Sequence, residues 1–129
     1  MKKAGLANNT LAIISAKHGQ SPIDVTLRQA VDDSLYDATP SFSSKVTDDV
    51  ALLWLAPQLQ QTDYSGAKAY LLFQKSALGI DTLLDKSDPA PLYGNPFGNN
   101  RTPDFIAETI HGLIYTSGMK LAEHGGFSG

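Results

Sequence analysis

Two histidines are each followed by glycine, one near either end of the 129-residue chain. His18 precedes Gly19, and His124 precedes Gly125 and Gly126. An imidazole suits transition-metal binding or acid–base catalysis, and glycine leaves the backbone around it uncrowded. Each histidine is also compatible with an ordinary loop residue. Because catalytic zinc sites use three protein ligands, two histidines do not by themselves define a metal site.

The other polar residues carry weaker signals. We interpret His111, which stands beside Gly112, as an edge or turn residue, and Asp48-Asp49 as a solvated edge before a strand. Ser21 lies too close to His18 along one loop to be expected to form a catalytic pair with it. The chain has neither a Gly-x-Ser-x-Gly nucleophile turn nor the Gly-Lys-Ser/Thr ending of a phosphate-binding loop.

Composition narrows the function further. Ten Lys and Arg against thirteen Asp and Glu give a net charge of −3, which argues against binding of a nucleic-acid polymer. The chain contains no Cys, so disulfides and thiolate sites are excluded. No apolar run approaches the ~18 residues of a membrane span. The opening residues do not form a convincing signal peptide, and the compartment stays undetermined.

Hydrophobic patterning predicts an α/β fold with a mostly parallel sheet flanked by helices. The expected strands are Leu11–Ser15, a run within 46–55, Phe105–Ala107 and Leu113–Tyr115. One helix is expected after Asp24, with Val25, Ala30, Val31 and Leu35 buried, and another from Ser65 to Leu78, ended by Gly79. Residues 80–84 read as a short amphipathic piece, 88–103 as an irregular loop and 119–122 as a connector.

Both ends of the chain favour a piece of a larger fold. Lys2–Ala7 resembles the last turn of a helix that Asn8-Asn9 ends, and residues 123–129 form a loop with no element after it.

Three segments together resemble the carboxyl-terminal part of the type I phosphodiesterase/nucleotide pyrophosphatase family of the alkaline phosphatase superfamily. They are residues 11–24 (LAIISAKHGQSPID), residues 48–55 (DDVALLWL), and residues 101–106 (RTPDFI) continued by 112–116 (GLIYT) and 122–127 (AEHGGF). The resemblance implies an alkaline-phosphatase-like layered fold. It also implies that residues 1–129 are a single incomplete domain, the carboxyl-terminal portion of a larger catalytic domain.

The chemistry implied by the resemblance is hydrolysis of phosphate esters at two divalent metal ions, usually zinc. His18 matches a strand-end ligand of one metal, and His124 matches a late ligand of the other. The family usually places a metal-binding Asp directly before the first histidine, whereas this chain has Lys17. A protonated ammonium cannot bind a cation, so we expect Lys17 either to weaken one metal site or to supply positive charge to the phosphate.

The expected function is therefore that of a fragment of a metal-dependent hydrolase acting on small phosphodiester or pyrophosphate substrates. The family's Thr or Ser nucleophile and remaining ligands match no residue here, so the chain alone should be inactive. The alternative is a non-catalytic binding or interaction module derived from the same fold, which Lys17 favours and the two histidines disfavour. A histidine-based phosphotransfer or cupin-like protein is a remote third interpretation.

Overall fold

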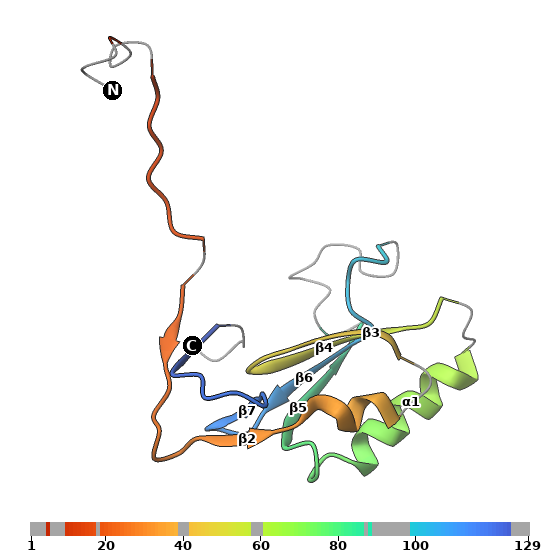
Figure 1. The fold of residues 1–129 in the computed structure, drawn as a ribbon. Coiled ribbons are helices and arrows are strands. Elements are labelled where there is room, and N and C mark those ends of the chain that lie inside the picture. The colour runs from red at the N-terminus through yellow and green to blue at the C-terminus, as the bar shows by residue number, and fades with distance from the viewer. Residues whose placement is uncertain are drawn as a thin grey trace.

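An antiparallel sheet with one helix against it forms the centre of the structure, a computed structural model (Figure 1). The structure describes residues 5, 10–17, 19–38, 42–57, 61–86, 88 and 99–124. The sheet has four strands in the order β3-β4-β6-β5. The strands are β3 (Phe42–Thr47), β4 (Val50–Leu55), β5 (Ile80–Asp85) and β6 (Phe105–Thr109).

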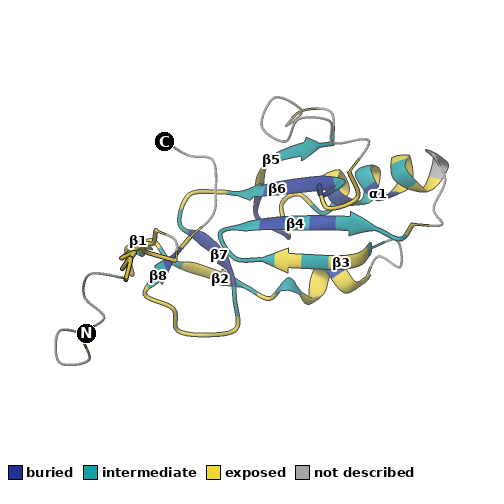
Figure 2. Cartoon of the chain, turned by 90° about the horizontal axis from the view of Figure 1, so that it is seen from above, coloured by how far each residue is buried: buried dark blue, intermediate teal, exposed yellow. Residues whose placement is uncertain are grey.

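Shorter elements lie beside this sheet (Figure 2). Strand β1 (Ser21–Pro22) pairs antiparallel with β8 (Ala122–Glu123), and β2 (Gln29–Val31) pairs parallel with β7 (Leu113–Tyr115). A 3-10 helix follows β2 at Asp33–Ala38. None of the helices in the described part of the chain has the length and apolar character that crossing a membrane requires.

The prediction of a mostly parallel sheet is wrong. Within the described residues, β2 and β7 are the only parallel neighbours. Strands β4 and β5, which precede and follow α1 in the sequence, run in the same direction. However, β6 inserts between them and runs antiparallel to both. A strand that arrives late in the sequence thus occupies the position that a parallel neighbour was expected to take.

A tight hairpin is the second reason for the antiparallel sheet. Asp48 and Asp49 join β3 to β4, with Val46 opposite Leu52 and Thr47 opposite Ala51. Only antiparallel strands can be connected by so short a link. The sequence predicts a strand within 46–55 with Asp48-Asp49 before it, and this turn lacks the Asn-Gly or Asp-Gly signal of a common hairpin. Strand β3 was therefore missed as a separate element.

Helix α1 (Gln61–Phe73) buries one stripe of side chains against the sheet. Ala67 and Leu71 are four residues apart, so they lie on one helix face, and both are buried. The helix predicted over 65–78 is confirmed over 65–73, and α1 begins four residues earlier and ends five residues earlier than predicted. Turns lead on to Gly79, which has a φ of +61° and precedes β5.

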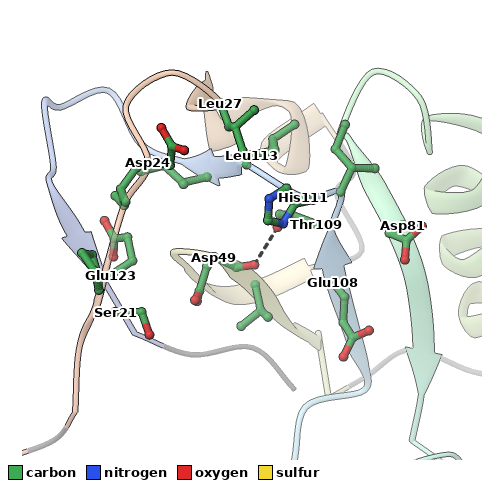
Figure 3. Close-up of a pocket in the computed structure, with 16 residues that line it drawn as sticks. Ser21, Asp24, Leu27, Asp49, Asp81, Glu108, Thr109, His111, Leu113 and Glu123 are labelled. Atoms are coloured by element: carbon green, nitrogen blue, oxygen red, sulfur yellow. Dashed lines mark hydrogen bonds between the residues drawn. The ribbon is translucent and has the colours of Figure 1, made fainter. Parts of the chain in front are cut away.

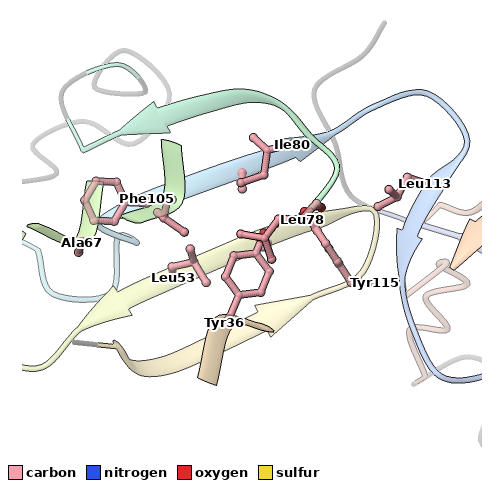
Figure 4. Packing of buried hydrophobic residues seen from close by; sticks show 11 residues of the cluster. Tyr36, Leu53, Ala67, Leu78, Ile80, Phe105, Leu113 and Tyr115 are labelled. Atoms are coloured by element: carbon pink, nitrogen blue, oxygen red, sulfur yellow. Dashed lines mark hydrogen bonds between the residues drawn. The ribbon is translucent and has the colours of Figure 1, made fainter. Parts of the chain in front are cut away.

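The hydrophobic core lies between this helix and the sheet (Figure 4). Phe105 is fully buried and contacts two other rings: its centroid lies 4.8 Å from that of Tyr64 and 6.4 Å from that of Phe42. At the other end of the core, the Tyr36 hydroxyl donates to the Tyr115 hydroxyl at 2.8 Å. The Tyr115 hydroxyl in turn donates to the carbonyl of Leu78, also at 2.8 Å.

Two other predicted elements are absent from the structure. Leu11–Ser15 is not a strand; its backbone has no regular structure, and Ile14 is 99% exposed. The helix expected after Asp24 is replaced by a turn, because Asp24 Oδ1 accepts hydrogen bonds from the backbone and hydroxyl of Thr26. Such a local bond offers the backbone an alternative to the helix. Val31 then joins the ladder with β7.

The strands predicted at 105–107 and 113–115 are confirmed as β6 and β7. The amphipathic piece at 80–84 is strand β5. The connector at 119–122 has no helix and leads into β8. The predicted helical turn over Lys2–Ala7 lies outside the described residues except for Gly5, as does most of the loop at 88–103.

Candidate functional site

The ladder between β1 and β8 brings the two histidine-bearing segments of the sequence together. Ser21 lies opposite Glu123, and Pro22 lies opposite Ala122. The backbone amide of Ile23 donates to the carbonyl of Leu121 at 3.0 Å, which extends the contact by one step. In an antiparallel pair, the residues before Ser21 and those after Glu123 leave the ladder at the same end.

The predicted site residues are only partly described. His18 lies outside the described residues, so its distance to His124 stays untested. Lys17 is described and exposed. His124 directly follows β8, with 47% of its side chain exposed. His111 occupies the turn before β7, which confirms its interpretation as a turn residue.

The Asp48 carboxylate lies close to the His124 imidazole. The distance from His124 Nε2 to Asp48 Oδ2 is 4.0 Å, which is within ion-pair range and longer than a hydrogen bond. Asp48 also forms an ion pair with the ammonium of Lys120. That ammonium lies 3.0 Å from Glu123 Oε1, so one lysine joins the β3–β4 hairpin to β8.

Burial and mutual contact shift these carboxyl groups in opposite directions. The pKa of Glu123 is raised by burial and by its hydrogen bond with Asp48. Burial alone would also raise the pKa of Asp48, but its hydrogen bonds with Glu123 and Lys120 outweigh this and lower it. The pKa of Lys120 is raised, chiefly by its hydrogen bond to Asp48.

Asp49, the neighbouring hairpin residue, has a different environment. Burial raises its pKa, and the charge of Asp48 raises it further. Its Oδ1 atom is buried with no hydrogen-bond partner among the described residues. The carbonyl of Asp49 accepts a hydrogen bond of 3.0 Å from the Thr109 hydroxyl, which ties the hairpin to β6 (Figure 3).

A hollow of about 520 Å³ lies beside this group (Figure 3). Five acidic side chains line it, namely Asp24, Asp49, Asp81, Glu108 and Glu123. His111 is a sixth titratable residue in the lining. Carboxylates repel a phosphate group at neutral pH. An anionic substrate would therefore need cations, from a metal or from lysine, to bind here.

The described residues do not by themselves form the metal centre that the resemblance implies. They contain no group of three His, Asp or Glu side chains placed to bind one ion. The half-exposed His124 imidazole with a carboxylate nearby fits a single zinc ligand. Catalytic zinc takes three protein ligands, a set that the described residues around His124 do not supply, and His18 lies outside the described residues.

Sequence reasoning missed Asp48 and Lys120 as members of this group. Asp48-Asp49 was taken for a solvated edge, yet the Asp48 side chain is only 20% exposed. Lys120 was placed in an unremarkable connector. The available signal was the pair of acidic residues directly before an apolar strand. Lys120, which pairs with Asp48, lies 72 residues further along the chain, so spacing alone does not reveal the pair.

Comparisons of this chain with family models, with curated proteins and with solved structures gave no match.

Proposed function

We propose that this chain supplies metal-binding histidines to a hydrolase of small phosphodiester or pyrophosphate substrates such as nucleotides. His124 binds one divalent ion and His18 the other, with zinc as the expected metal. Two such ions activate a hydroxyl nucleophile and neutralise charge on the phosphoryl oxygens. Lys17 adds positive charge for the phosphate.

The pairing of β1 with β8 is the observation that carries this proposal. It joins segments from opposite ends of the sequence so that Gly19-Gln20 and His124 leave one ladder at the same end. A shared site for the two histidine segments requires such a meeting. The acidic lining of the neighbouring hollow also supports a function that depends on cations.

Zinc analysis of the protein expressed from its complete reading frame tests the proposal. We expect stoichiometric zinc in the wild type and a marked loss in His18→Ala and in His124→Ala. His111→Ala is the comparison variant and should retain its zinc, because the proposal assigns the two ions to His18 and His124 and none to His111, an exposed turn residue that lines the hollow. Hydrolysis of a nitrophenyl phosphodiester in preference to the monoester would support the reaction class. A wild type without zinc, or histidine variants with full zinc content, would overturn the proposal.

A non-catalytic interaction module is the second candidate, and the exposed segment before β1 favours it. Leu11 is 84% exposed and Ile13 is 79% exposed, which is unusual for a continuous apolar run. Under this alternative the segment would contact a partner and the histidines would bind no metal. The same zinc analysis separates the two functions.

A further inference from the structure

We propose that Asp48 is the positioning residue of the His124 imidazole and that Lys120 holds the Asp48 carboxylate in place for this role. The inference rests on the proposed function, in which His124 is a metal ligand. It adds two residues that the resemblance did not assign and identifies how each of them acts.

The backbone of Asp48 is fixed by the sheet. Its amide donates to the carbonyl of Val50 at 2.9 Å, and its carbonyl accepts from the amide of Tyr115 at 2.8 Å. Tyr115 is a core residue with 2% exposure. Asp48 is therefore attached at one side to the hairpin and at the other to β7, which makes it a firmer support than the two-residue strand that precedes His124.

The two oxygens of Asp48 face different partners. Oδ1 pairs with Lys120, whereas Oδ2 faces His124 Nε2 at 4.0 Å. The Asp48 side chain is 20% exposed, against 47% for His124, so the carboxylate is the more enclosed of the two. With Oδ1 held by an ammonium, rotation of the carboxylate is restricted and Oδ2 stays directed at the imidazole.

A carboxylate next to a metal-binding histidine has a known role at metal sites, which is to orient the imidazole ring. Histidines that bind zinc usually present their other ring nitrogen to a carboxylate or carbonyl, which fixes the tautomer and the ring orientation. His124 lies half exposed at the end of a short ladder, where a carboxylate can restrict the ring. Asp48 provides this carboxylate from a rigid hairpin.

The chain offers a matched control for the test. Asp49→Asn makes the same change of charge as Asp48→Asn, one residue away in the same hairpin. Asp49 also interacts electrostatically with His124, so this variant controls for the loss of a nearby negative charge. Asp48→Glu keeps the carboxylate and tests for rescue. Lys120→Met removes the anchor while leaving Asp48 intact.

The first measurement needs no metal. Three-bond couplings of the His124 side chain in the metal-free protein should show one dominant χ1 rotamer in the wild type and in Asp49→Asn. We expect averaged couplings in Asp48→Asn, partial averaging in Lys120→Met, and recovery in Asp48→Glu. Averaged couplings in the wild type, or no change in Asp48→Asn, would contradict the inference.

The second measurement is calorimetric titration with Zn²⁺ of the protein from the complete reading frame. Loss of an outer-shell partner weakens metal affinity by about 10–100-fold, which is the effect expected of Asp48→Asn. Asp49→Asn should stay within about twofold of the wild type.

If His124→Ala weakens zinc binding while both aspartate variants behave alike, the positioning role fails and the proposed function stands. If His124→Ala changes nothing, the proposed function fails and the inference fails with it. Loss of zinc binding in Asp48→Asn as complete as in His124→Ala would make Asp48 a direct ligand and overturn the positioning role.

Discussion

The central sheet and the segments around β1 differ in how firmly the chain is held. In the sheet, β4 pairs with β6 over four consecutive positions, and every second pair points into the core. Around β1, a two-residue ladder with β8 makes the connection. The side chains differ in the same way: Leu53 and Phe105 are fully buried, whereas Ile14 is almost fully exposed.

This contrast separates stability from chemistry. Regions with few buried apolar contacts open at low free energy, whereas a packed core opens only on global unfolding. The candidate site draws Lys17 and His124 from the weakly held region and Asp48 from the rigid one. At the β3–β4 hairpin, the central sheet thus contacts the candidate site residue His124.

Removing the central ring of the core should have the largest effect. Phe105 is fully buried and contacts Tyr64 and Phe42, so Phe105→Ala leaves a cavity under α1. We expect a loss of about 3–5 kcal/mol in the free energy of unfolding, measured by urea denaturation. A loss below about 1 kcal/mol would show that the sheet and α1 are not the main source of stability.

The same contrast explains what sequence alone could predict. Val50–Leu55 and Leu113–Tyr115 were located correctly because their burial is decided by a local apolar run. Sheet order was not predictable, since β6 enters between β4 and β5 from far along the chain. Leu11–Ser15 has an equally apolar run, yet no described neighbour buries it. The role of the two histidine segments stays a prediction from their residue types, whereas the contact between Asp48 and Lys120 becomes visible only in the structure.

Glycine substitutions should have opposite effects in the two regions. Gly112 has a φ of +83°, and a Cβ there would lie 2.5 Å from the backbone oxygen of Leu27. Gly112→Ala should therefore cost about 1–3 kcal/mol and disturb the loop before β2. Gly66 lies in α1 with open space around it, so Gly66→Ala should stabilise by up to about 1 kcal/mol. Thermal denaturation of both variants tests this, and a shift of the same sign in both would contradict it.

The buried tyrosine pair provides a comparison within the core. Tyr115→Phe removes the donor to the Leu78 carbonyl and the acceptor for Tyr36, and it should cost about 1–3 kcal/mol. Tyr36→Phe leaves the bond from Tyr115 to Leu78 intact, so a loss nearer 1 kcal/mol is expected. Equal losses in denaturant unfolding would mean that the two hydroxyls do not act as a chain.

Asp49 should show a pH-dependent effect at the boundary between the regions. Its pKa is raised in the folded protein by burial, so the native state favours the protonated carboxyl. That stabilising contribution is fully present below the unfolded pKa of about 3.9 and is lost as pH rises through the folded pKa. Asn mimics the neutral form at every pH. Asp49→Asn should therefore be more stable than the wild type at pH 7 and equal to it near pH 3.

Asp48→Asn should have the opposite sign, because the pKa of Asp48 is lowered by its hydrogen bonds with Glu123 and Lys120 despite its burial. Its contribution is present above the unfolded pKa and disappears as pH falls through the folded pKa. Urea midpoints of both variants between pH 3 and pH 7 measure the difference. Identical pH profiles for the two neighbouring residues would show that they share one environment.

The smallest effect is expected where the chain is most exposed. Ile14 is 99% exposed, so Ile14→Lys removes no buried surface and should change the free energy of unfolding by less than about 0.5 kcal/mol. The matched core variant Leu53→Lys places a charge among fully buried neighbours and should prevent folding. If Ile14→Lys instead destabilised the protein by several kcal/mol, the segment before β1 would have to be buried in solution. The distinction between a well-packed central sheet and a weakly held segment before β1 would then be wrong, and Leu11–Ser15 would be buried as its apolar sequence predicts.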